Sequence, residues 1–278
     1  MRNSIQKIQN FKLQHKKITA LTAYDYSTAK YIDEAGVDII LVGDSLSQVV
    51  LGLENTTDIS MDEMLIFTRA VSRGVKNALL VADMPFMSFH EDIKNTPKNA
   101  CKLIKAGANA VKMEGSSDFI IDSIKHLSQI GIPVMGHLGF TPLSINSLGG
   151  HRIQGKDASR TVEILNQAKR LEEAGCFAIV LELMPDKSAQ YITQRINIPT
   201  IGIGAGVDCD GQILVSDDIL GKYDRFKPKF ARQYVSLKDI ILNAAKQYCT
   251  DVENTSFPNA SESFELEYKE VCELENHK

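Results

Sequence analysis

The chain has 278 residues, of which 44% are hydrophobic and 24% charged, a composition typical of soluble globular proteins. Its net charge of -4 provides no basic field for nucleic acid or an anionic membrane, and no apolar run approaches the roughly 20 residues of a membrane span. Five dispersed cysteines without a CxxC pair argue against a disulfide framework or a zinc cluster. The N-terminus lacks the apolar core of a signal peptide, so we expect a cytoplasmic protein with reduced thiols.

The chain alternates β-rich and helical segments after a first predicted helix at residues 4–15. The predicted strands are 18–25, 39–42, 78–82, 110–113, 132–139, 178–181, 198–206 and 211–215. The predicted helices that join most of them are 26–35, 61–75, 98–105, 117–129, 159–174 and 188–196. Ser60 with Glu63 is a capping-box pattern for the second of these helices. Residues 48–60 and the Gly-rich stretch 140–156 are expected to be long loops.

Regular alternation of strands and helices predicts parallel strands joined by right-handed crossovers. Eight such units in about 220 residues favour a closed (β/α)8 barrel, and an open doubly wound sheet is the alternative. We divide the chain into a barrel domain with its N-terminal helix, residues 1–250, and an acidic tail, residues 251–278. The tail carries eight acidic residues against two lysines, and residues 264–274 within it have a helical apolar stripe.

Four acidic residues come at or just after the ends of apolar strands: Asp44, Asp83, Glu114 and Glu182. In a barrel the carboxyl ends of all strands meet at one rim, which is where active sites of this fold lie. The simpler explanation is that acids after strands cap the next helix. Four of them, two with a polar partner in Ser45 or Lys112, favour a shared site.

Asp44, Asp83 and Glu114 come from three consecutive units and would lie side by side. Three carboxylates without a His or Cys cluster suit Mg²⁺, a hard cation that keeps positions for water and substrate. Lys112 precedes Glu114 by two residues, so both side chains leave the strand on one face. Lys112 therefore offers a cation for an anionic substrate oxygen, with an ion pair to one of the acids as the alternative.

Glu182 follows an apolar strand on the far side of the ring, where partial burial suits a general base. His137 ends another strand and is a candidate for a supporting hydrogen bond or for a purely structural role. Gly202, Gly204 and Gly206 form GxGxG, a weak dinucleotide signal that more simply indicates close approach of backbone or ligand.

Several motifs, in this order, resemble ketopantoate hydroxymethyltransferases (3-methyl-2-oxobutanoate hydroxymethyltransferases). The similarity covers roughly residues 18–248, and together the motifs are specific to that family. They are TALTAYD (19–25), VGDSL (42–46), ADMPF (82–86), AVKMEG (110–115), GHLGFTP (136–142), VLE (180–182), IGIGAG (201–206) and CDGQ (209–212).

The resemblance implies a barrel of the phosphoenolpyruvate/pyruvate superfamily and a Mg²⁺-dependent, aldolase-like reaction through a Mg²⁺-stabilised enolate. It implies transfer of a hydroxymethyl group from 5,10-methylenetetrahydrofolate to 3-methyl-2-oxobutanoate, which gives ketopantoate on the pathway to pantothenate. By position, the metal site is implied at Asp44, Asp83 and Glu114, and the proton acceptor at Glu182. The keto-acid site is implied at Asp44, Ser45, Asp83 and Lys112. The family is cytoplasmic and often a homodecamer.

The chain departs from the family pattern at Ser47-Gln48, where Gly-Met is common, and at Ser116, where a second Gly is common. Neither position matches a site residue. Two alternatives stay open: another metal-dependent C–C lyase or aldolase of the same superfamily, and a non-catalytic barrel. The catalytic Cys motif of isocitrate lyases is absent from the sequence.

Overall fold

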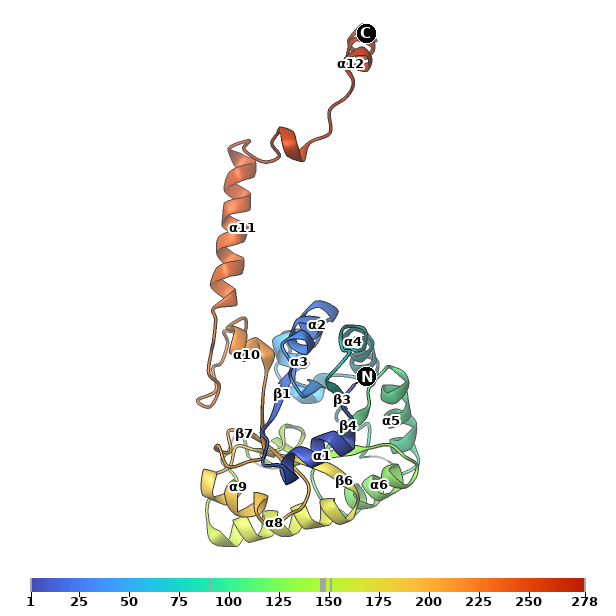
Figure 1. Cartoon of the computed structure of the whole chain (residues 1–278), viewed down its shortest axis with the longest axis vertical. Coiled ribbons are helices and arrows are strands. Elements are labelled where there is room, and N and C mark those ends of the chain that lie inside the picture. The colour runs from blue at the N-terminus through green and yellow to red at the C-terminus, as the bar shows by residue number, and fades with distance from the viewer. Residues whose placement is uncertain (1, 91, 146–148, 151, 278) are drawn as a thin grey trace.

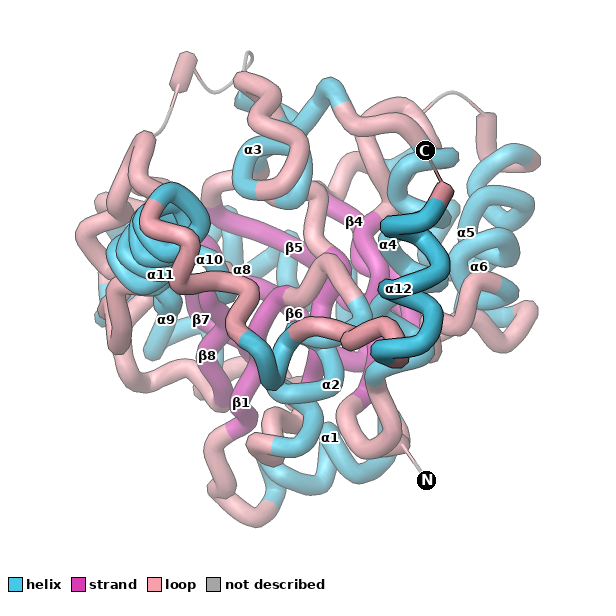
Figure 2. The backbone as a smooth tube through the Cα atoms, turned by 90° about the horizontal axis from the view of Figure 1, so that it is seen from above, coloured by secondary structure: helices cyan, strands magenta, loops and turns pink. Residues whose placement is uncertain are grey.

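The computed structural model describes residues 2–90, 92–145, 149–150 and 152–277. Eight parallel strands pair in chain order, and β8 pairs with β1 to close a barrel, which excludes the open sheet. Seen from above, helices surround the strands (Figure 2). The strands are β1 Ile18–Thr22, β2 Ile39–Val42, β3 Leu79–Asp83, β4 Ala110–Glu114, β5 Val134–Gly139, β6 Cys176–Glu182, β7 Thr200–Ile203 and β8 Gly211–Leu214.

The helices begin and end close to the predicted positions over most of the barrel. Ser60 accepts the Glu63 backbone N–H, and the Glu63 side chain accepts the Ser60 N–H, so the predicted capping box is confirmed. The helices are α1 Ile5–Leu13, α2 Tyr26–Glu34, α3 Leu46–Val49, α4 Met61–Gly74, α5 Asn95–Lys105, α6 Asp118–Gln129, α8 Ala158–Glu173, α9 Asp186–Thr193, α10 Ser216–Leu220, α11 Leu237–Glu253 and α12 Tyr268–Asn276.

Several expectations differ from the structure: the strands expected at 18–25 and 198–206 end at Thr22 and Ile203, and α10 is not among the predicted helices. The loop expected at 48–60 begins inside α3, because α3 starts directly after the predicted site residue Ser45. The same loop also contains a 3-10 turn, Thr56–Asp58. The helix expected at 264–274 lies at 268–276, since nothing packs on the fully exposed Phe264 to fix an earlier start. Helix α11 is not among the predicted elements, and it runs through the position where we divide the chain. The Gly-rich loop 140–156 lies partly outside the described residues.

Two apolar layers hold the barrel together. The interior is filled by strand residues of alternating position, and α1 closes its N-terminal end with Ile8 and Phe11, which are buried against it. Lys12 anchors α1 there through its ion pair to Asp210 at 2.9 Å. The second, larger layer lies between the strands and the surrounding helices. With one end closed by α1, the opposite rim is left to carry the site.

Helices α11 and α12 extend away from the barrel (Figure 1). No residue of either helix is buried. Along α11, Ile241, Ala245, Tyr248 and Val252 form one apolar stripe, and the opposite face is polar. Among the described residues, no helix combines the length and apolar character needed to cross a membrane.

Candidate active site

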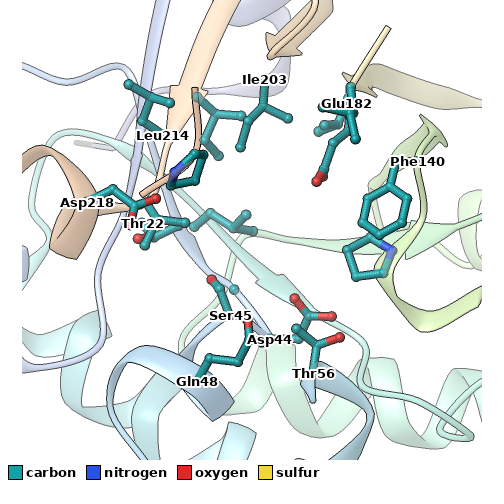
Figure 3. A pocket seen from close by; sticks show the side chains of 18 of the residues that line it. Thr22, Asp44, Ser45, Gln48, Thr56, Phe140, Glu182, Ile203, Leu214 and Asp218 are labelled. Carbon is teal, nitrogen blue, oxygen red and sulfur yellow. The ribbon is translucent and has the colours of Figure 1, made fainter. Parts of the chain in front are cut away.

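The acids at the strand ends reach one cavity of about 430 Å³ at the carboxyl rim of the barrel. Strand register helps, because it places Asp83 beside Lys112 and Glu114 beside His137. Figure 3 shows Asp44 and Ser45 on one wall and the Glu182 carboxylate facing them from across the cavity. Every predicted site residue lines this cavity: Asp44, Ser45, Asp83, Lys112, Glu114, His137 and Glu182.

Lys112 is the buried cation of the site. Its Nζ atom lies 2.5 Å from Asp83 Oδ1 and 3.9 Å from Glu114 Oε1. Burial disfavours the ammonium, but the carboxylates of Asp83, Glu114 and Asp44 outweigh it and raise the pKa of Lys112 above its ordinary value. The ion pair that we weighed as the alternative for Lys112 is therefore present, and its ammonium stays charged at the cavity wall.

Asp44 is the site carboxylate that the protein leaves uncompensated. Its backbone N–H donates to Asp83 Oδ2 at 2.9 Å, whereas its own carboxylate has no hydrogen bond or ion pair within the described residues. Asp44 is nevertheless buried, with only 7% of its surface exposed. Burial, and next to it the charge of Asp83, raise the pKa of Asp44 well above its usual range. A cation bound at this wall would remove that penalty.

His137 bridges two glutamates from the strands on either side of it. Its Nδ1 atom is 3.2 Å from Glu114 Oε1, and its Nε2 atom is 3.1 Å from Glu182 Oε2, the latter without the alignment of a hydrogen bond. Burial opposes the imidazolium, but Glu114 and Glu182 raise the pKa of His137 to about 9. His137 is thus a buried cation at neutral pH, and it links the metal-site candidate Glu114 to the candidate base Glu182.

Glu114 is held more firmly than Asp44. Its second oxygen accepts the Leu143 backbone N–H at 3.0 Å. Burial raises the pKa of Glu114, but His137, Lys112 and the Leu143 N–H lower it further, so the net pKa lies below the ordinary value. This carboxylate is ionised and fixed in orientation.

Ser45 meets a partner that the sequence analysis did not single out. Its hydroxyl lies 2.8 Å from the Tyr24 hydroxyl, which belongs to the segment directly after β1. Burial raises the pKa of Tyr24, so the phenol stays neutral and retains its O–H. The pair fixes the Ser45 oxygen at the cavity wall opposite Glu182.

The carboxylate oxygens of this cavity are the kind of ligand that a hard divalent cation prefers, although in the described residues they are not already arranged around one point. Within the described part of the chain, no three His, Cys, Asp or Glu side chains are arranged to hold a metal ion. The contacts explain this result, because Asp83 is engaged by Lys112 and Glu114 by His137. Four carboxylates nevertheless face two cations here, so the wall keeps an excess of negative charge with Asp44 as its free oxygen donor.

The rest of the cavity wall comes from residues that sequence reasoning did not assign. The connecting segment, residues 221–236 between α10 and α11, contributes aromatic rings, and Asp218 of α10 adds a fifth carboxylate. Arg225 ties the connecting segment to the Gly52 carbonyl oxygen at 3.0 Å, across the rim. Asp218 lies four residues after the end of β8. The pattern that identified the other acids, a carboxylate shortly after an apolar strand, could therefore have identified Asp218 as well.

Comparison with known proteins identifies close relatives. Residues 2–260 match the family described as ketopantoate hydroxymethyltransferase. A 3-methyl-2-oxobutanoate hydroxymethyltransferase of Clostridium botulinum is 50% identical over 275 residues, which are 99% of this chain and 100% of that protein. The protein of the same name from Nitrosopumilus maritimus is 46% identical and covers 99% of this chain and 98% of its own length.

Solved structures with the same fold are more distant in sequence. A phosphonopyruvate hydrolase, solved with oxalate and Mg²⁺, has a TM-score of 0.61 at 14% identity, and the match covers 98% of this chain and 94% of that one. A 2,3-dimethylmalate lyase, described as a member of the PEP mutase/isocitrate lyase superfamily, has a TM-score of 0.59 at 12% identity and covers 99% of both chains. These likenesses show a barrel of the type that we expected from the sequence.

Proposed function

Because the chain belongs to the ketopantoate hydroxymethyltransferase family, we propose that the cavity at its barrel rim carries out the reaction for which the family is named. The chain is a transferase that acts on 3-methyl-2-oxobutanoate and gives ketopantoate, a step toward pantothenate. We further propose 5,10-methylenetetrahydrofolate as the donor of the one-carbon unit and Mg²⁺ as the metal. The observation that carries this proposal is the gathering of Asp44, Lys112 and Glu182 around one cavity.

The keto acid is an anion, and the wall with Lys112 and Ser45 suits its oxygens. Ser45, held by Tyr24, would donate a hydrogen bond to the substrate carboxylate. Lys112 is a buried, charged donor, and an ammonium with little exposure to water stabilises a negative oxygen more strongly than one in solution. Asp44, Asp83 and Glu114 would hold Mg²⁺, which polarises the α-keto carbonyl when it is bound.

Glu182 is the proposed base that removes the proton from C3 of the keto acid. Glu182 lies at the end of β6, and its side chain is 18% exposed and faces the cavity wall that carries Asp44 (Figure 3). As the proton leaves C3, negative charge moves to the keto oxygen, where the Lys112 ammonium stabilises it. The nucleophilic carbon then forms a C–C bond to the one-carbon unit. Both C–N bonds of the folate methylene group break, water supplies the hydroxyl oxygen of the product, and tetrahydrofolate leaves with protons on the two nitrogens. His137 would orient Glu182 while it holds Glu114 in place.

Replacing Glu182 by Gln tests the proposed base directly. With Mg²⁺ and without folate, the wild-type protein should exchange the C3 proton of 3-methyl-2-oxobutanoate in deuterated water, as followed by NMR. We expect Glu182→Gln to slow this exchange by roughly 100-fold or more, since a positioned base contributes about that much. Binding of the keto acid, measured by calorimetry, should be retained because the amide keeps the shape of the carboxyl group.

Glu163→Gln is the control, since Glu163 lies on the outer surface in an ion pair with Arg160 and should exchange normally. EDTA should stop exchange by the wild-type protein, and added Mg²⁺ should restore it. Exchange at the wild-type rate by Glu182→Gln would remove Glu182 from its role. Folate-dependent formation of ketopantoate completes the test and separates this reaction from those of other lyases of the superfamily.

We also propose that the chain works as a homo-oligomer, with a decamer as the form implied by the family resemblance. The support lies in α11, whose apolar stripe is exposed on the single chain. Exposed apolar stripes of this kind are typical of surfaces that pack against another chain.

A further inference from the structure

The cavity has a second half that the keto acid does not need. Figure 3 shows Leu214 and Asp218 on the wall away from Asp44 and Glu182, and Ile203 of β7 lies between them and Glu182, its neighbour in the sheet. Tyr223, Phe226 and Phe230 of the connecting segment line the same cavity. This half is therefore largely apolar and aromatic, and Lys229 of the same segment and the Asp218 carboxyl group add charged groups to the cavity lining.

The Asp218 carboxyl group has no hydrogen-bond or ion-pair partner in the part of the chain that the structure describes. Among the described residues, Asp218 forms hydrogen bonds only through its backbone atoms, whereas the neighbouring Asp217 is paired with Lys222 at 3.1 Å. Burial, and then the charge of Asp217, raise the pKa of Asp218 to about 6. The protein thus keeps an ionisable group at an energetic disadvantage on the cavity wall, a pattern that indicates a binding role.

The charge of Asp218 excludes the keto acid from this half and indicates a ligand with N–H donors. A carboxylate accepts two parallel hydrogen bonds from adjacent N–H groups, and aromatic rings beside it suit a flat heterocycle. The pterin ring of a reduced folate presents such an edge, formed by its 2-amino group and its N3–H. Resting on the proposed function, we propose that Asp218 binds this edge and thereby holds the one-carbon donor against the keto acid.

The test replaces Asp218 by Asn, which keeps the shape but turns one acceptor into a donor that faces the 2-amino group. We expect the KM for 5,10-methylenetetrahydrofolate to rise roughly 10- to 100-fold, the usual effect of losing a charge-assisted hydrogen bond. Exchange of the C3 proton without folate should be unchanged, which also shows that the variant is folded. Asp224→Asn is the matched control, since Asp224 lies in the connecting segment and pairs with Lys238 at the surface.

A second measurement uses ligand chemistry and needs no variant to fold. Wild-type protein should bind tetrahydrofolate more tightly than its 2-desamino analogue by a similar factor, measured by calorimetry, and Asp218→Asn should no longer distinguish the two. Equal affinities in the wild type, or an unchanged KM in an exchange-competent Asp218→Asn, would overturn the assignment of Asp218 while leaving the proposed reaction intact. Absence of both exchange and ketopantoate formation in the wild type would instead overturn the proposed function, and this inference with it.

Discussion

At the scale of single residues, neighbours decide what each strand-end carboxylate can do. Glu114 and Asp83 are held in orientation by His137 and Lys112, and these partners offset the cost of burying the Glu114 carboxylate. Within the described residues neither Asp44 nor Asp218 forms an ion pair, and burial raises the pKa of both carboxyl groups. The two unpaired carboxyl groups mark the two places where we expect a ligand to supply the missing partner.

The cost of keeping Asp218 unpaired gives a prediction about stability and pH. Its pKa rises from an ordinary 3.8 to about 6 in the folded protein. As the pH increases across this window, the unfolded chain ionises the group more readily, so the folded state of the wild type loses stability. Asp218→Asn has no such loss. The difference between its thermal midpoint and that of the wild type should therefore grow in favour of the variant from pH 3.8 to about 6, and this difference should stay constant at higher pH.

Asp224→Asn provides a control of opposite sign in the same experiment. The Lys238 hydrogen bond lowers the pKa of Asp224 in the folded protein, so its contribution to stability is present at higher pH and is lost on acidification. The control variant should therefore match the wild type in acid and fall slightly below it at neutral pH. A midpoint of Asp218→Asn that tracks the wild type at every pH would contradict the unpaired state of Asp218.

At the scale of elements, the GxGxG stretch shows close approach between two segments, one of the two readings that we gave it. Gly204 follows β7 with φ +62°, and a Cβ atom built there would lie 2.7 Å from Cδ1 of Phe230. Gly202 likewise leaves room for the side chain of Cys209. The glycines thus let the connecting segment lie against the end of β7 and bring Phe230 to the cavity wall.

Gly204→Ala should therefore do more than strain the backbone. A left-handed conformation costs alanine about 1 kcal/mol, and the clash with Phe230 adds roughly 1–3 kcal/mol of overpacking. Gly131→Ala is the matched control, since Gly131 also has positive φ (+85°) but nothing within 4 Å of a built Cβ. Urea unfolding compares the two losses in free energy, and equal losses would show that the contact with Phe230 is unimportant.

At the scale of the whole molecule, the barrel is self-contained but the C-terminal helices are not. Ile241 and Tyr248 of α11 are about half exposed, at 51% and 58%, although the Phe257 ring contacts Tyr248, and no residue of the helix is buried. An amphipathic helix gains most of its stability from packing its apolar face. We therefore expect this stripe to be buried against another copy of the chain in the assembly.

The double variant Ile241→Lys/Tyr248→Lys tests the expectation by placing charge on the apolar stripe. Light scattering with size-exclusion chromatography should give a smaller assembly than the wild type, because burying two ammonium groups in an apolar contact is costly. Asn243→Lys/Thr250→Lys carries the same charges on the polar face of α11 and should keep the wild-type mass. A full-size assembly from the stripe variant would show that α11 is not part of the contact.

The amino-acid sequence by itself determined the barrel, the order of its strands and the acids at their carboxyl ends. These follow from local pattern, since short apolar runs alternate with helical periodicity and a parallel barrel turns every strand end to one rim. The residues themselves suggested a metal site and a general base, and the family resemblance added the reaction and its substrates.

Only the tertiary structure decided which charges meet. The ion pair of Lys112 with Asp83, the place of His137 between Glu114 and Glu182, and the unpaired state of Asp218 depend on distances between residues far apart in the chain. The aromatic half of the cavity likewise depends on how the irregular segment 221–236 lies over the rim, and no periodic pattern encodes that path. Side-chain charge is local information, but its pairing and burial are properties of the packed molecule.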